Sequence, residues 1–203
     1  DQAGELTATQ VAGLTTTQIS KLEAEDLAEL STAAIAALSA TQVGGLATTA
    51  LNALDASQFG ALNATQVRAL TATQISGLTA SDIADIKTTQ IAALTTTQLA
   101  GLTATTIEGL VETQITALAA TQVQALTGTN VAHFADTQIA ALTATQAAAL
   151  TTTQVRALNA TNVGAFTETQ VGALTTTQIA SMSNTNLSAL ADTQSAALTT
   201  TQL

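Results

Sequence analysis

The chain has 203 residues and a formal net charge of −10, although only 9% of its residues are charged. It contains no Cys, Pro, Trp or Tyr, whereas 46% of its residues are apolar and evenly spread. This apolar content excludes disorder, which requires low hydrophobicity and a high charge density. The only basic residues are Lys21, Arg68, Lys87 and Arg156, so we expect no nucleic-acid partner.

No apolar run approaches the roughly 18 to 20 residues that a membrane helix requires, and no signal-peptide pattern opens the chain. We therefore expect no membrane insertion. The absence of Cys leaves the redox compartment open, because a repeat array can be stable outside the cell without disulfides.

From Leu6 to its end the chain consists of octads that follow one another without insertion or deletion. Position one is Leu in 21 of the 25 octads, position four is Thr in 21, and position five is Gln in 17. Position six is almost always Val, Ile or Leu, and position eight is mostly Ala or Gly. Positions one and six therefore predict the core, whereas the variable position seven is predicted to face water.

The spacing of the apolar positions argues against a β-solenoid and against one long helix. Positions one and six lie five and then three residues apart, which does not match the alternation of a strand. Eight residues at about 100° each overshoot two helical turns by about 80°, so the Leu residues would spiral around a continuous helix.

The motif Leu-Thr-x-Thr-Gln-Ile instead matches a helix start, first at Leu6–Val11 and then in most octads. Thr at position two is the expected N-cap, and Gln at position five is its partner in a capping box. Small residues at position eight, such as Gly13 and Gly101, suit the bend that ends each helix. Each octad is thus predicted to form one very short helix and a corner.

Helices this short cannot stand alone, because helix nucleation is costly, so stability must come from stacking. We predict an all-α solenoid with one helix per octad and two octads per coil, or alternatively three. Layers roughly 9 to 10 Å apart would then make a rod about 110 to 125 Å long. Residues 1–203 are predicted to form a single continuous solenoid, a window of a longer array or a unit that stacks end to end.

Glutamine recurs at position five and offers two interpretations: a row of ligand-binding groups, or a buried amide row that closes capping boxes and satisfies backbone groups. The second is favoured because positions five and one lie four residues apart on one helix face. The predicted structural amide row consists of Gln10, Gln18, Gln42, Gln66, Gln74, Gln90, Gln98, Gln114, Gln122, Gln138, Gln154, Gln170 and Gln178.

Other candidate sites are weak. The acidic octad Leu22–Glu29 matches no calcium-loop spacing, and the single histidine, His133, has no second His or Cys to complete a metal site. Glycosylation sequons stand at Asn63, Asn159 and Asn186, and Asn186 occupies the inner position five. We assign no catalytic residue, cofactor or metal, and expect no enzymatic activity.

The repeated unit, as in Leu94–Gly101 and Leu174–Ser181, resembles the LTTTQIAA-type octapeptide arrays of very large bacterial surface or secreted, adhesin-like proteins. The resemblance covers the whole chain and implies an extracellular or cell-surface structural role, with no haem or calcium residue carried over.

The leading hypothesis is a non-enzymatic rod that acts as a spacer, stalk or fibre-forming segment and self-associates end to end or laterally. The alternative is a binding module that presents a Thr-rich surface to glycan, ice or mineral. Thr-x-Thr pairs such as Thr7/Thr9 occur in 11 octads and are similar to the threonine arrays of ice-binding solenoids. Those arrays lie on flat strands, which the spacing does not predict here.

Overall fold

The computed structural model describes residues 3–203, which form 24 short α-helices after one 3-10 turn. The helices contain four to six residues each, and no described residue belongs to a β-strand. The all-α class and the presence of one short helix per octad are therefore confirmed.

The chain divides between Gly109 and Leu110 into two compact units, although the octads continue across this point without interruption. The N-terminal unit contains η1 (Ala3–Glu5), α1 (Ala8–Ala12), α2 (Thr16–Ile19), α3 (Ala24–Glu29), α4 (Thr32–Ala37), α5 (Ala40–Gly44), α6 (Thr48–Leu51), α7 (Ala56–Phe59), α8 (Ala64–Ala69), α9 (Ala72–Ser76), α10 (Ala80–Asp85), α11 (Thr88–Ile91), α12 (Thr96–Ala100) and α13 (Ala104–Glu108). That residues 1–203 form one continuous solenoid stays a prediction.

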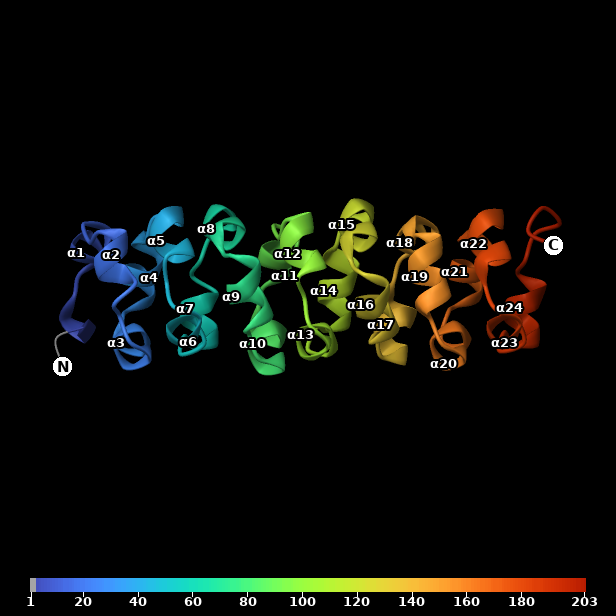
Figure 1. The fold of residues 1–203 in the computed structure, drawn as a ribbon, viewed down its shortest axis with the longest axis horizontal. Helices are drawn as coiled ribbons and strands as arrows, with labels where there is room; N and C mark the ends of the chain where they lie inside the picture. The colour runs from blue at the N-terminus through green and yellow to red at the C-terminus, as the bar shows by residue number, and fades with distance from the viewer. Residues whose placement is uncertain (1–2) are drawn as a thin grey trace. The chain divides into compact units, whose positions relative to one another are not determined.

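The C-terminal unit is built in the same way, and Figure 1 shows its helices in chain order from green to red. It contains α14 (Glu112–Ala117), α15 (Ala120–Ala125), α16 (Gly128–Ala132), α17 (Asp136–Ala141), α18 (Ala144–Ala149), α19 (Thr152–Ala157), α20 (Ala160–Gly164), α21 (Glu168–Ala173), α22 (Thr176–Ser181), α23 (Asn184–Leu187) and α24 (Asp192–Ala196).

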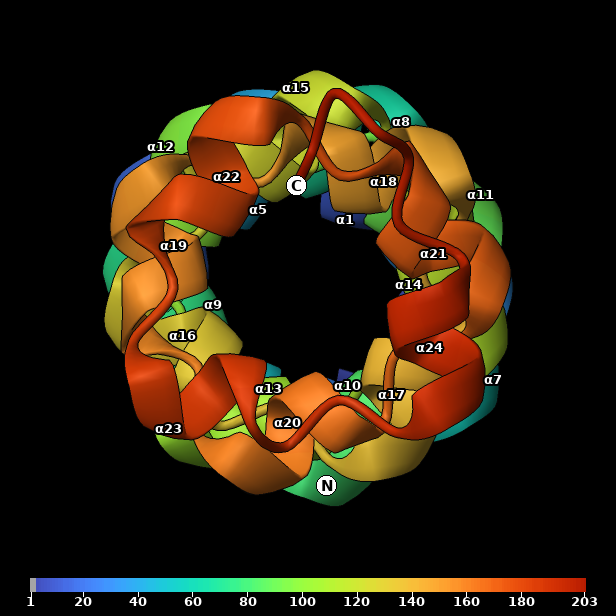
Figure 2. The same ribbon diagram turned by 90° about the vertical axis from the view of Figure 1, so that its right-hand side faces the viewer.

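Within each unit the chain winds into coils, because a helix packs against the helix three places later in the sequence. Examples are α1 with α4 and α5 with α8 in the N-terminal unit, and α16 with α19 and α21 with α24 in the C-terminal unit. Figure 2 shows α21, α22 and α23 succeeding one another around a ring until α24 returns to the side of α21, in a right-handed sense. The solenoid is therefore confirmed.

Each coil takes more than two octads, so the preferred expectation of two octads per coil is wrong. Hydrogen bonds between successive coils join residues 28 and 31 positions apart, so one coil takes more than three octads. The physical reason lies in the corner. Two extended residues, such as Leu70 at φ −58° and ψ 135° and Thr71 at φ −72° and ψ 157°, join two helices and turn the chain through only part of a circle. The rod length that assumed two octads per coil loses its basis.

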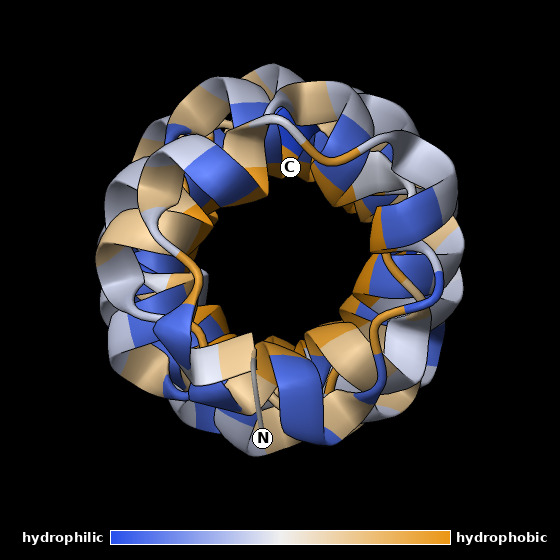
Figure 3. Ribbon diagram, turned by 90° about the vertical axis from the view of Figure 1, so that its left-hand side faces the viewer, coloured by the Kyte–Doolittle hydropathy of each residue, from blue (hydrophilic) through white to orange (hydrophobic). Residues whose placement is uncertain are grey.

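Positions one and six supply the core, as their spacing predicts. Position-six side chains such as Ile75 and Ile107 are fully buried, and position-one side chains such as Leu70 and Leu78 are 3% exposed. Figure 3 shows the most hydrophobic residues on the inner side of the coils. Burial of a Leu or Ile side chain stabilises a fold by about 1.5 to 3 kcal/mol, so each octad contributes two such increments.

Small residues at position eight do not act through a left-handed bend. Gly13 and Gly101 end their helices at φ −81° and −85°, in the right-handed region, and no described residue has a positive φ. Close approach of the neighbouring coil accounts for the small side chain instead. A Cβ added at Gly109 would lie 2.6 Å from the carbonyl oxygen of Ala80, and one at Gly101 would lie 3.1 Å from the Cβ of Ala72.

None of the helices in residues 3–203 is long and apolar enough to cross a membrane.

Candidate functional site: the amide row

The glutamine of each octad first acts within its own helix. In α12, the Oε1 atom of Gln98 accepts the backbone N–H of Thr95 at 2.7 Å, and the Thr95 hydroxyl oxygen accepts the backbone N–H of Gln98 at 3.2 Å. This capping box satisfies two backbone groups that a helix start leaves without a partner. It needs only residues three apart, so the octad alone encodes it.

The same glutamine also binds the coil before it. Its Nε2 atom donates to the carbonyl oxygens of Val67 at 2.9 Å and Leu70 at 2.7 Å, which lie at the end of α8. The carbonyl of Val67 also accepts the N–H of Leu70 at 3.2 Å, whereas no backbone N–H of the described residues donates to the carbonyl of Leu70. One buried amide therefore satisfies the start of one helix and the end of another. Its side chain is only 3% exposed, so both hydrogen bonds form away from water.

This arrangement recurs through both units. The amide nitrogen donates to the carbonyl oxygen of the position-one residue 28 places earlier at Gln42, Gln66, Gln74, Gln90, Gln138, Gln154, Gln170 and Gln178. Gln114 and Gln122 are buried, and each accepts the backbone N–H of its own N-cap residue. Asn162 and Asn186 make the same contact through a shorter amide, at 3.0 and 2.8 Å.

Two members of the predicted row are not internal. Gln10 and Gln18 close capping boxes with Thr7 and Thr15, but their side chains are exposed. The reason is positional, because no described residue stands 28 places before either glutamine. Their inclusion in the buried row is therefore corrected.

Four further glutamines belong to the row, and their position five was the signal that identified them. Gln58, Gln146, Gln194 and Gln202 are buried and donate to the carbonyls of Leu30, Leu118, Phe166 and Leu174.

A second set of contacts between coils has no signal in the sequence. The Nε atom of Arg68 donates to the carbonyl oxygen of Ala93 at 3.2 Å, and Nζ of Lys87 donates to that of Gly60 at 2.7 Å. Asn52 similarly donates from Nδ2 to Gly77 at 2.7 Å. These partners lie 25 to 27 residues apart, so they become neighbours only when the coil closes.

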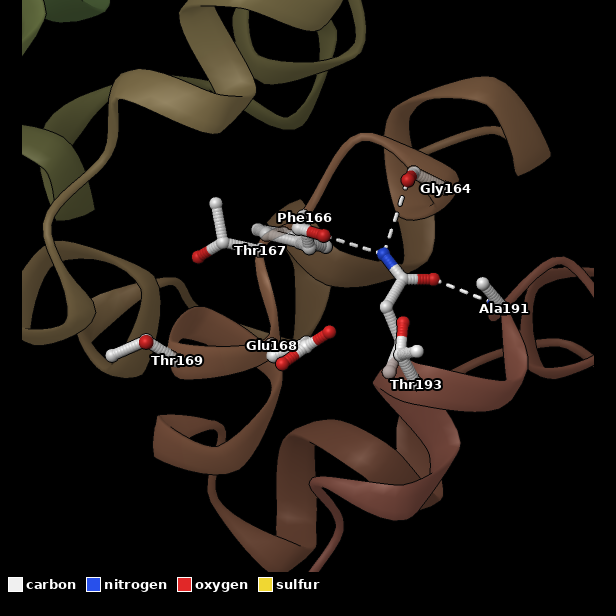
Figure 4. Close-up of a pocket in the computed structure, with 8 residues that line it drawn as sticks. Gly164, Phe166, Thr167, Glu168, Thr169, Ala191 and Thr193 are labelled. Atoms are coloured by element: carbon white, nitrogen blue, oxygen red, sulfur yellow. Dashed lines mark hydrogen bonds between the residues drawn. The ribbon is translucent and has the colours of Figure 1, made fainter.

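An open surface cavity of about 470 Å³ lies in the C-terminal unit between the start of α21 and the start of α24. Figure 4 shows the carboxylate of Glu168 and the side chains of Thr167 and Thr193 around it, and the Gln194 amide bonds close one side. Gly164 and Ala191 also line the cavity. Position seven is Gly at residue 164, and Ala191 stands where an N-cap hydroxyl is usual, so two absent side chains leave this space open.

The remaining candidates have structural positions. His133 is the exposed C-cap residue of α16, and within residues 3–203 no group of three or more His, Cys, Asp or Glu side chains could hold a metal ion. In the acidic octad, Asp26 accepts the backbone N–H of Glu23 at 3.0 Å and so caps α3. Asn63 and Asn159 are exposed N-caps, whereas Asn186 is buried.

One carboxyl group has a shifted pKa. Glu112 is the first residue of α14, and its own backbone N–H lowers the pKa of its carboxyl group, with a smaller contribution from the Thr137 hydroxyl. This is the electrostatic signature of an acid at a helix start, where free N–H groups favour the charged form.

Comparison with known proteins supports the repeat. A protein-family model described as the ALTTAQ repeat matches residues 19–56 in the N-terminal unit and residues 152–184 in the C-terminal unit. The chain is an octapeptide-repeat array. No curated protein and no solved structure matches it.

Proposed function

We propose that the chain is a structural, non-enzymatic element, an extended spacer, stalk or fibre-forming segment. One observation carries the proposal: the amide that recurs at position five is used inside the fold. The Nε2 group of Gln98 donates to Val67 and Leu70, and its side chain is only 3% exposed, so the amide is not presented to an outside ligand. A repeat that uses its recurring amide to join successive coils is suited to forming an extended element.

The proposal places this element outside a cell and gives it self-association as its partner interaction. The support for the location is the resemblance of the octads to those of large bacterial surface proteins. The support for self-association is physical, because a solenoid holds itself together by contacts between like coils and a second copy offers the same surfaces.

The spacer proposal is tested by changing the number of octads. Duplicating residues 142–173 adds four whole octads and leaves every position-five contact of the C-terminal unit with a partner. Small-angle scattering should show that the maximum dimension grows by an equal step, about 10 Å for one packed layer, with one and then two added copies. The helical circular dichroism per residue should stay constant. An insertion that increases the radius in all directions, as in a globule, would contradict the proposal.

A binding module is the second candidate, and two observations favour it. Every Thr at position four is exposed, including Thr169 and Thr193, and these two residues also line the 470 Å³ cavity beside Glu168. Hydroxyl groups around a carboxylate suit a polyhydroxylated ligand such as a glycan.

This candidate is tested with a glycan array and an ice-recrystallisation assay on the whole chain. Binding to an array glycan that the variant Ala191→Thr abolishes would establish the cavity as the site, because this variant narrows the cavity while adding an N-cap. Ala119→Thr, which adds an N-cap away from the cavity, is the matched control. No binding in either assay would leave the spacer proposal as the better account.

A further inference from the structure

The amide row is interrupted, and all its interruptions lie in the N-terminal unit. Position five carries no amide at Asp26, Ala34, Ala50, Asp82 and Thr106, whereas every octad of the C-terminal unit has Gln or Asn there. The inference drawn from this asymmetry does not depend on the proposed function.

Four of the five interruptions remove a hydrogen bond between coils, since no described residue stands 28 places before Asp26. By the 28-residue rule, the carbonyl oxygens of Leu6, Leu22, Leu54 and Leu78 would accept from residues 34, 50, 82 and 106. No side chain in the described part of the chain donates to them, whereas Leu62 and Leu70 accept from Gln90 and Gln98 at 2.8 and 2.7 Å.

The replacing side chains have other partners. The Thr106 hydroxyl donates to the carbonyl oxygen of Thr103, the N-cap of its own helix, at 2.9 Å. The Asp82 carboxylate accepts the N–H and hydroxyl of Thr79 at 2.8 and 2.7 Å, and an ionised carboxylate has no proton to donate to Leu54.

Two of the missing bonds follow each other along one side of the unit. Position-five residues 32 places apart lie on successive coils. Residue 50 would donate to Leu22 and residue 82 to Leu54, and Leu54 stands only four residues after residue 50. Gln18, Ala50 and Asp82 form one such line, which we call the open seam. Neither Ala50 nor Asp82 makes the contact to the coil before it, whereas the parallel line of Gln10, Gln42 and Gln74 makes both.

Packing is loosest at the Asp82 end of the open seam. Among the helix pairs three places apart inside either unit, α7 and α10 make the sparsest contact in the described structure. A small cavity of about 10 Å³ lies between them, lined by Leu54, Ala56 and Phe59.

The charge around this cavity also opposes closure. Asp55, Asp82 and Asp85 line it, and like charges at short range repel each other. The ammonium group of Lys87 is engaged with the carbonyl of Gly60 at the end of α7, and Lys87 does not line the cavity.

We propose that the contact between α7 and α10 is a joint at which the N-terminal unit opens before any other part of the described array. A missing hydrogen bond, loose packing and three carboxylates meet there. Opening separates the coils before and after the joint, while the amide bonds on either side persist. The array thereby contains a compliant segment at a defined place.

Hydrogen exchange with mass spectrometry on the whole chain tests this joint. After correction for intrinsic rates, amides of residues 55–59 and 80–85 should exchange at least threefold faster than those of α8 and α11. The Gln98 amide bonds to the end of α8, and the Gln90 amide of α11 bonds to the coil before it. Equal protection in all four helices would overturn the proposal.

Three variants separate the missing bond from the charge. Asp82→Gln supplies the amide, and Asp82→Asn supplies the shorter one that bonds at Asn162 and Asn186. Both should slow exchange in α7 and α10 by about three- to tenfold, the range expected for one net hydrogen bond. Asp85→Asn removes the same charge from the same helix without adding a position-five donor.

If Asp85→Asn slows exchange as much as either Asp82 variant does, the missing hydrogen bond does not contribute to opening and that part of the proposal is overturned; if none of the three slows it, the joint is overturned. Circular dichroism of each variant establishes that the fold is retained, and the use of two amide lengths guards against a variant that does not fit.

Discussion

The Nε2 atom of Gln98 lies 2.7 Å from the carbonyl oxygen of Leu70, although 28 residues separate the two. Leu70 is the extended residue that ends α8 and turns the chain, and Gln98 opens α12 one coil later. The corner of one coil is thus held by the helix start of the next. This relationship explains why leucine and glutamine recur together: the first supplies a buried corner, and the second satisfies its carbonyl.

Removing one amide should weaken its coil. Gln98→Ala loses the bonds to Val67 and Leu70 and leaves the buried carbonyl of Leu70 without a donor, which should cost about 1 to 3 kcal/mol of unfolding free energy. Urea denaturation followed by circular dichroism measures it. Gln18→Ala is the control, because Gln18 makes only the capping contact and its exposed amide should cost under about 1 kcal/mol. Equal losses in the two variants would contradict a buried role for Gln98.

Adding an N-cap should stabilise the C-terminal unit. Ala119 precedes α15 in an extended conformation and has no hydroxyl to accept the free N–H groups of that helix. Ala119→Thr should therefore raise the unfolding free energy by about 0.5 to 2 kcal/mol. Ala120→Thr places the same side chain one residue later, inside the helix, and should be neutral or slightly destabilising. A gain from Ala120→Thr as large as that from Ala119→Thr would show that capping is not the source.

Two glycines should respond oppositely to Ala. In Gly109→Ala the new Cβ would lie 2.6 Å from a backbone oxygen of Ala80, so the coil must shift, at a cost of about 1 to 3 kcal/mol. In Gly164→Ala the nearest atom is 3.7 Å away, and the residue ends a helix, so we expect no loss and a gain of up to about 1 kcal/mol. Thermal unfolding compares them. A tolerated Gly109→Ala would mean that the coils are less closely packed than described.

The core should depend on position six. Ile139 is fully buried, and Ile139→Ala should cost about 2 to 5 kcal/mol through lost burial and a cavity. Leu187 holds the same position but is 36% exposed, so Leu187→Ala should cost clearly less. Urea denaturation of both variants gives the ratio. Comparable losses would mean that the side chain of Leu187 is covered in solution.

The lowered pKa of Glu112 predicts a pH dependence. Because the folded-state pKa lies below the unfolded value, the carboxylate contributes stability above the unfolded pKa. That contribution is lost as the pH falls through the folded-state value. The stability difference between the chain and Glu112→Gln should therefore be present at pH 7 and disappear in acid. Because Glu112 is fully exposed, the difference should be small and should shrink in high salt. A difference that persists at low pH would assign it to packing.

The sequence alone determined the hydrogen bonds that close within one octad and the side chains that any stacking must bury. Thr95 and Gln98 stand three apart, so the capping box and hence the helix start could be predicted from local spacing. The burial of Ile75 and Leu78 followed from the octad pattern, because any stacked arrangement must cover these two positions. One short helix per octad and the all-α class came from the same local rules.

Only the tertiary structure decided the width of the coil, because each corner adds a turn whose size the local pattern does not specify. Everything that depends on that width was therefore beyond the sequence. The width of the coil pairs Gln98 with Leu70 and Lys87 with Gly60. It also leaves Gln18 exposed and places Asp82 and Asp55 at the same small cavity. A small change in the angle at each corner would pair other residues, since contacts between coils add up the turns of more than three octads.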